Sequence, residues 1–132
     1  MKKLAKHMTG KGEMTVSVKH LQEIEALVVK NGIGVTKKVL ISLEEAPNFA
    51  MRCFSFQPGG KMPSHTNRVE HEQFVLRGRG KIGIGDEVFE VQKGDVVFIP
   101  AEVPHWYVNI GEEPFEFLCV VPNKPDTTTL LE

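Results

Sequence analysis

Residues 58–80 hold most of the side chains in this chain whose types and spacing could do chemistry. His65 and Asn67 stand two positions apart, and His71 follows Asn67 after three further residues. Residues two apart on a β-strand point to the same face, so His65 and Asn67 should point together. A tight turn over residues 68–70 would return the chain and let His71 face them across a hairpin. The spacing therefore indicates a site built from imidazole and amide groups.

His105 is a further histidine that such a site could use, although it lies on a distant segment. Only a closed β-barrel can bring its strand alongside residues 65–71. Imidazoles that converge inside a small barrel are suitable ligands for Zn, Fe, Ni, Cu or Mn. His7 and His20 lie outside these segments, and we expect them at the surface.

The elements that must position these residues are short β-strands. Turn residues recur about every eight to twelve positions, which is typical of a β-sandwich or barrel. No segment after residue 30 keeps a helical period, whereas residues 20–29 fit either a helical turn or a strand. The glycines between residues 78 and 94 predict bulges or tight bends. The runs expected as strands are residues 14–19, 38–43, 49–57, 72–77, 81–85, 88–92, 96–99, 105–109 and 115–121.

Two segments resemble the two sequence motifs of the cupin family. Residues 59–78 match the first motif at Gly59, His65 and Gly78, and Asn67 and His71 stand at the positions of its second histidine and its glutamate. Residues 94–109 match the second at Gly94, Pro100, Ala101, His105 and Asn109, and Glu102 replaces a glycine that is usual there. The chain thus resembles a small single-domain cupin, and the resemblance implies an all-β fold, the jelly-roll barrel or double-stranded β-helix.

The resemblance also implies a metal site, with one departure from the family pattern. The usual ligands are two histidines and a glutamate from the first motif and a histidine from the second. Here His71 stands at the glutamate position, as in the four-histidine branch of small cupins, but Asn67 replaces the second histidine. The implied ligands of one divalent transition metal ion are His65, His71 and His105. Asn67 is either a fourth ligand or a hydrogen-bond partner.

Two glutamates offer an alternative ligand from the same segment. Glu72 follows His71 and should point to the opposite face, so we set it aside. Glu70 sits in the predicted turn and stays open. Gln73 shares a face with His71 and could supply a supporting hydrogen bond.

The pocket around the site follows from the alternation of side chains. Tyr107 shares a face with His105, while Phe117 and Cys119 lie on the face opposite Glu116, which prefers water. We therefore expect Tyr107, Phe117 and Cys119 in the wall of an apolar, aromatic pocket with few polar groups.

The outer face of the last strand is apolar as well, through Leu118 and Val120. An outward apolar face predicts a covering second subunit, and hence a homodimer. The amino-terminal arm could lie on that subunit.

Length, charge and cysteine content bound the other expectations. We expect an arm with the first strand or strands over 1–30, a cupin barrel over 31–122, and a tail over 123–132 that adds little to the core. The 16 basic and 17 acidic residues leave no electrostatic footprint for nucleic acid. Without a signal pattern or an apolar run of about twenty residues, we expect a cytoplasmic protein with no membrane partner. Cys53 and Cys119 are expected as buried free thiols.

Three functions remain open on these grounds. The first is a metal-binding cupin acting on a small, mostly apolar organic molecule, as a metal-dependent dioxygenase. The second is a non-catalytic module that binds or senses a small ligand. The third, isomerisation of a sugar or keto acid, is disfavoured because the expected pocket lacks Lys and Arg. Arg52 would change that conclusion if its strand points it inward.

Overall fold

The computed structural model describes residues 3–10 and 12–131, and its elements are almost all strands, which confirms the all-β prediction. Of the predicted arm and tail, residues 1–2, 11 and 132 lie outside the described residues. The strands are β1 (Lys3–Thr9), β2 (Gly12–Val18), β3 (Leu27–Val28), β4 (Ile33–Ile41), β5 (Phe49–Thr66), β6 (His71–Arg77), β7 (Arg79–Ile84), β8 (Glu87–Gln92), β9 (Val96–Ile99), β10 (His105–Asn109), β11 (Phe115–Pro122) and β12 (Thr129–Leu130). The segment that fitted either a helical turn or a strand contains both, a 3₁₀ turn η1 (Leu21–Glu23) and then β3.

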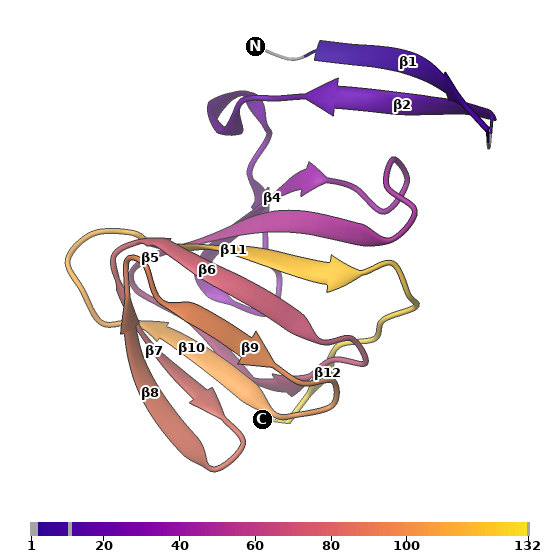
Figure 1. Ribbon diagram of the computed structural model, residues 1–132. Coiled ribbons are helices and arrows are strands. Elements are labelled where there is room, and N and C mark those ends of the chain that lie inside the picture. The colour runs from indigo at the N-terminus through magenta and orange to yellow at the C-terminus, as the bar shows by residue number, and fades with distance from the viewer. Residues whose placement is uncertain (1–2, 11, 132) are drawn as a thin grey trace.

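Strand β5 connects the two halves of the curled main sheet (Figure 1). The sheet has the order β8-β7-β10-β5-β11-β6-β9, with β4 and β12 also paired to β5. The first half of β5 pairs with β11 and β4, so that Phe56 lies opposite Phe115. Its last residues pair with β10 and β12 instead, and His65 lies opposite His105. Because β5 changes partners along its 18 residues, the sheet closes around an interior.

Alternating side chains fill one end of this interior with aromatic rings. Buried and half-buried residues alternate along β10 and β11. Phe56, Phe115 and Phe117 are fully buried, and Phe54 and Tyr107 stack on Phe117 at centroid distances of 5.5 and 5.2 Å. Burial of each such ring contributes about 1.5–3 kcal/mol. The packed rings therefore close one end of the interior.

Two glycines of β7 allow neighbouring rings to approach the strand closely. A Cβ atom at Gly83 would lie 1.9 Å from Nε1 of Trp106, and one at Gly80 would lie 2.5 Å from the ring of Phe115. The sequence predicted bends at these glycines, but inside β7 they serve close packing. Turns occur at the two ends of the strand, where Gly78 and Gly85 have φ angles of 79° and 60°.

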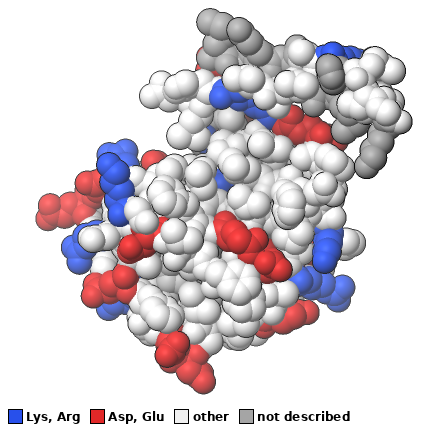
Figure 2. All heavy atoms as spheres, in the orientation of Figure 1, with Lys and Arg blue, Asp and Glu red and all other residues white. Residues whose placement is uncertain are grey.

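The outer face of β11, β6 and β9 is largely apolar. Leu118 and Val120 are half-buried there, whereas Phe74, Val96 and Phe98 are exposed. In Figure 2 much of the side that carries these strands is white, although a few acidic groups interrupt it. The homodimer inferred from this face stays a prediction. No helix in the described part of the chain has the length and apolar character needed to cross a membrane.

The β1–β2 hairpin forms a separate two-stranded sheet that stands away from the main sheet (Figure 1). Met8, Val16 and Val18 expose half or more of their surface. A two-stranded hairpin alone is marginally stable in water. Its position must therefore depend on contacts with the body of the protein.

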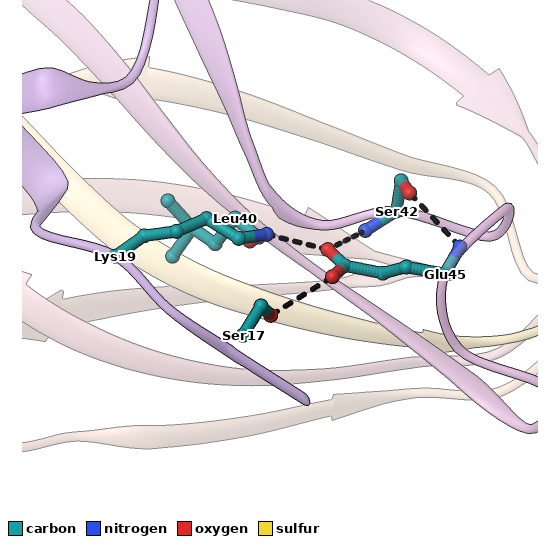
Figure 3. Close-up of polar contacts among 5 residues, drawn as sticks. All are labelled: Ser17, Lys19, Leu40, Ser42 and Glu45. Carbon is teal, nitrogen blue, oxygen red and sulfur yellow. Dashed lines mark hydrogen bonds and ion pairs between the residues drawn. The ribbon is translucent and has the colours of Figure 1, made fainter. Parts of the chain in front are cut away.

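Glu45, in the loop between β4 and β5, supplies such a contact (Figure 3). Its carboxylate accepts hydrogen bonds from Ser17 Oγ at 2.9 Å, from Lys19 Nζ at 2.5 Å and from the backbone N–H of Ser42 at 3.1 Å. The hydrogen bond from Lys19 is the main cause that holds the pKa of Glu45 below its usual range. Lys19 also donates to the carbonyl of Leu40. Glu45 thus links the end of the hairpin to the edge of the main sheet.

We predict that Glu45→Ala loosens the hairpin without unfolding the barrel, because the substitution removes the acceptor for both Ser17 and Lys19. Hydrogen exchange measured by mass spectrometry should become faster in residues 12–19 and stay unchanged in β6 and β10. Glu44→Ala, at an exposed neighbouring carboxylate, is the matched control. Equal exchange in residues 12–19 of the wild-type protein and Glu45→Ala would show that Glu45 is not the anchor.

Candidate functional site

The fold brings the four predicted polar side chains together in one cavity of about 380 Å³. His65 lies near the end of β5, and Asn67 follows directly after that strand. His71 is the first residue of β6, and His105 is the first residue of β10. All four are buried, with exposed fractions of 2–7%. The ring centroid of His105 lies 4.2 Å from that of His65 and 5.3 Å from that of His71. The histidine pair of β5 and β10 thus meets directly, as a closed barrel requires.

Backbone carbonyl groups fix the tautomers of two of these imidazoles. Nδ1 of His65 lies 2.8 Å from the carbonyl oxygen of Pro63, and Nδ1 of His105 lies 2.9 Å from that of Val103. A carbonyl oxygen can only accept, so each Nδ1 carries the proton and donates it. In a neutral imidazole the Nε2 atom then holds a free lone pair. His65 and His105 therefore offer Nε2 as an acceptor or as a metal ligand.

Asn67 is oriented by the carboxyl-terminal tail. Its Nδ2 group donates to Asp126 Oδ2 at 3.2 Å and to Thr128 Oγ1 at 2.9 Å, which leaves Oδ1 pointing to His71. The tail reaches this position because β12 pairs with the end of β5. No role at the site was predicted for the tail, and no spacing signal near residues 126–128 indicated one.

The two atoms of His71 and Asn67 that could bind a metal ion, Nε2 and Oδ1, lie next to each other. His71 Nε2 lies 3.1 Å from Asn67 Oδ1, and His71 Nδ1 lies 3.5 Å from Cys119 Sγ. In one tautomer Nε2–H donates to Oδ1. In the other, Nδ1–H donates to Cys119 Sγ, and two lone pairs face each other across a space that a cation would fill. Ligands at right angles on an ion at about 2.1 Å are about 3 Å apart, so the spacing suits two ligands of one ion.

Burial keeps all three imidazoles neutral. Loss of hydration is the main cause that lowers the pKa of His71 to about 3 and that of His105 to about 4, and it lowers the pKa of His65 as well. The positive charge of Arg52 contributes to the shift at His71. Neutral imidazoles bind metal ions without first losing a proton. Within the described residues, however, no group of three or more His, Cys, Asp or Glu side chains is arranged so that it could hold a metal ion as the side chains stand.

The expected pocket residues line the same cavity. Tyr107, Phe117 and Cys119 are buried in its wall. The hydroxyl of Tyr107 accepts a hydrogen bond from Gln73 Nε2 at 2.7 Å, and burial raises the pKa of Tyr107 well above its usual value. Tyr107 therefore stays protonated and can act as a hydrogen-bond donor to a ligand. It does not fit the role of a base.

The alternative ligands lie elsewhere. Glu70 is exposed and Glu72 is half-buried, and neither lines the cavity. The position of Glu72 outside the cavity agrees with the prediction that its side chain points away from His71. Gln73 lies beside the site, although it contacts Tyr107 and Cys119 rather than His71. It positions the wall of the cavity and not the imidazole itself.

The expectation of a pocket without Lys or Arg is wrong. Arg52, Lys37 and Lys30 all line the cavity. Arg52 lies opposite Cys119 in the β5–β11 register, so it shares the inward face with that residue. The alternation of side chains along residues 50–56 allowed this orientation, but only the pairing with β11 decides which face is inside.

Comparisons with known proteins agree with this architecture. The family of the cupin domain matches residues 52–121. An uncharacterized protein of Methanocaldococcus jannaschii is 38% identical over 77 residues, which cover 56% of this chain and 62% of that protein. Acireductone dioxygenase 1 of Pectobacterium atrosepticum is 33% identical over 110 residues, which cover 80% of this chain and 59% of that enzyme. The chain thus spans less than two thirds of the length of either relative.

Solved structures extend the likeness to nearly the whole chain. The polyketide cyclase RemF from Streptomyces resistomycificus superposes with a TM-score of 0.80 and 28% sequence identity, over 87% of this chain and 84% of that chain. This likeness and the family match confirm the predicted jelly-roll barrel.

We predict that the protein, freed of metal ions with a chelator, loses stability as the pH falls from 6.5 to 4. A histidine of the unfolded chain takes up a proton near pH 6.5, whereas His71 and His105 in the folded protein do so only near 3 and 4. In this window the unfolded state binds more protons, so the free energy of unfolding falls by about 1.4 kcal/mol per pH unit for each such histidine. Urea denaturation at a series of pH values measures the slope.

His71→Gln should lower this slope by about 1.4 kcal/mol per pH unit, which is the contribution of one proton. His20→Gln, at an exposed histidine, should leave it unchanged. If the wild-type protein and His71→Gln show the same slope, burial does not keep His71 neutral.

Proposed function

The chain belongs to the cupin family, and we propose that it binds one divalent transition metal ion and acts on a small organic molecule as a metal-dependent dioxygenase. The observation that carries the proposal is the pair of carbonyl acceptors, of Pro63 and Val103, that leaves the Nε2 lone pairs of His65 and His105 free in one buried cavity. Two imidazole lone pairs in one cavity suit a divalent transition metal ion, because such ions take neutral imidazole nitrogen as a ligand.

His65, His71 and His105 would hold the ion, and Asn67 Oδ1 would be a weaker fourth ligand. Neutral imidazole suits Zn, Fe, Ni and Cu and binds Mn more weakly, and the donor set therefore leaves the metal open. When bound, such an ion supplies Lewis acidity and positions for O₂ or substrate, since three or four protein ligands leave coordination sites open.

The other residues of the cavity bind and orient the substrate. Phe54 and Phe117 form a stacked wall that would exclude water from one side of a bound molecule. Tyr107 could donate its phenolic proton in a hydrogen bond to a substrate oxygen, while Gln73 fixes the position of that hydroxyl. No carboxylate of the described residues stands beside the imidazoles as a base, apart from Asp126 behind Asn67.

The likeness to an acireductone dioxygenase supports the dioxygenase class over the alternatives. The second candidate is a non-catalytic module that binds a small ligand, which the replacement of a histidine by Asn67 would fit. The third, isomerisation of a sugar or keto acid, was disfavoured for want of a cation, and Arg52 removes that objection. Oxygen consumption separates the first candidate from both others.

We predict that the purified protein retains about one equivalent of Mn, Fe, Ni, Cu or Zn after reconstitution and dialysis. His65→Ala/His105→Ala should weaken metal binding by more than about a hundredfold, because even changes outside the ligands cost 10–100-fold. Asn67→His should tighten binding, since imidazole is the better ligand. Elemental analysis and competition with a chromogenic chelator give occupancy and affinity.

His20→Ala is the matched control for the loss of a histidine outside the cavity. A wild-type protein that retains none of these metals would overturn metal binding and leave the ligand-binding module as the function. An unchanged affinity in Asn67→His would mean that residue 67 is only a hydrogen-bond partner.

We further predict that the Fe or Mn form consumes O₂ in the presence of a small aromatic or enediol substrate. An oxygen electrode measures the rate with a panel of such compounds, and the metal-poor double variant should show none of it. A fully loaded protein that consumes no O₂ with any compound, but binds some of them, would contradict the dioxygenase class.

A further inference from the structure

The cavity wall beyond His71 is cationic. Arg52 and Lys37 lie next to each other there, because Lys37 of β4 pairs with Phe54 of β5, two residues after Arg52. Among the described residues, neither has a carboxylate within salt-bridge distance. Two positive charges thus line one cavity with no carboxylate in contact with either.

The guanidinium of Arg52 is held in place but not satisfied. Its Nη2 group donates to Cys119 Sγ at 3.3 Å, and its Cζ atom lies 5.1 Å from the centroid of the Phe54 ring. Its Nε–H is buried and has no hydrogen-bond partner among the described residues. A buried N–H without a partner costs about 1–3 kcal/mol, so a ligand acceptor at this position would recover free energy.

Lys37 experiences the same unbalanced charge. Burial is the main cause that lowers its pKa, and repulsion from Arg52 lowers it further. An anion between the two groups would offset their repulsion, since opposite charge favours the charged form of each.

The carboxylate that lines the cavity, that of Asp126, is engaged at the other end of the site. It accepts from Asn67 Nδ2 and from the backbone N–H groups of Arg68 and Thr127. The contacts run from Asp126 through Asn67 and His71 to Cys119 and then Arg52. The imidazoles therefore lie between a satisfied carboxylate and unsatisfied cations.

We propose that the ligand of this cavity is a small organic carboxylate, whose anionic group binds Arg52 and Lys37 while its remaining part lies against Phe54, Phe117 and Tyr107 in front of the imidazoles. This inference rests on the proposed function, because it names the substrate class of the same site. It replaces the expected mostly apolar molecule by one with an apolar body and a charged end. The planar guanidinium suits a carboxylate, which can accept two parallel hydrogen bonds.

The test compares carboxylates with their neutral amides of the same shape. Acetate, pyruvate, benzoate and phenylacetate are titrated against their amides by isothermal calorimetry, with metal-free and with Mn-loaded protein. At least one carboxylate should bind about tenfold or more tightly than its amide, and Arg52→Met should remove roughly tenfold to a hundredfold of that affinity. Lys37→Met should remove less, and Arg52→Lys should keep part of it.

Arg79→Met removes one positive charge outside the cavity and should change nothing. If every carboxylate binds no better than its amide, or none binds at millimolar concentration, the inference is wrong whether or not the variants fold. An unchanged preference in both Arg52→Met and Lys37→Met would place the anion elsewhere and also overturn it. Metal content, measured on the same samples, tests the proposed function separately. The tighter binding of carboxylates than of amides is expected in the metal-free protein as well.

Discussion

The pairing of β5 with its neighbours is the constraint on which the rest of the structure depends. One long strand carries Arg52 and Phe54 in its first half and His65 near its end, and it pairs with β11 along the first half and with β10 along the second. A shift of either register by one residue would turn every side chain to the other face. Both ends of the cavity therefore depend on the same backbone hydrogen bonds.

The histidines show how burial and chemistry are linked in this fold. Removing three imidazoles from water favours their neutral form. The carbonyl groups of Pro63 in β5 and of Val103 before β10 then determine which nitrogen of His65 and His105 keeps the proton. The outcome is a pair of Nε2 lone pairs, on His65 and His105, that belong to one cavity. The same burial that lowers basicity is what makes the site suitable for a cation.

Charge within the cavity is arranged asymmetrically. Asp126 holds Asn67 at one end through an amide hydrogen bond, and Arg52 and Lys37 stand at the other end without a carboxylate partner among the described residues. Aromatic rings form the wall between these ends. A molecule that enters would be oriented by this separation of charge and by the shape of the rings.

The sequence by itself determined the all-β fold, most strand positions and the segment pair that carries the three histidines. Local rules suffice there, because turn residues and the two-residue alternation act within a few positions of the chain. The inward orientation of Tyr107, Phe117 and Cys119 also followed from alternation. Only the tertiary structure decided that Arg52 faces the cavity and that the tail positions Asn67. Both depend on pairing between segments far apart in the chain, β5 with β11 and β12 with β5, and no local pattern specifies such a register.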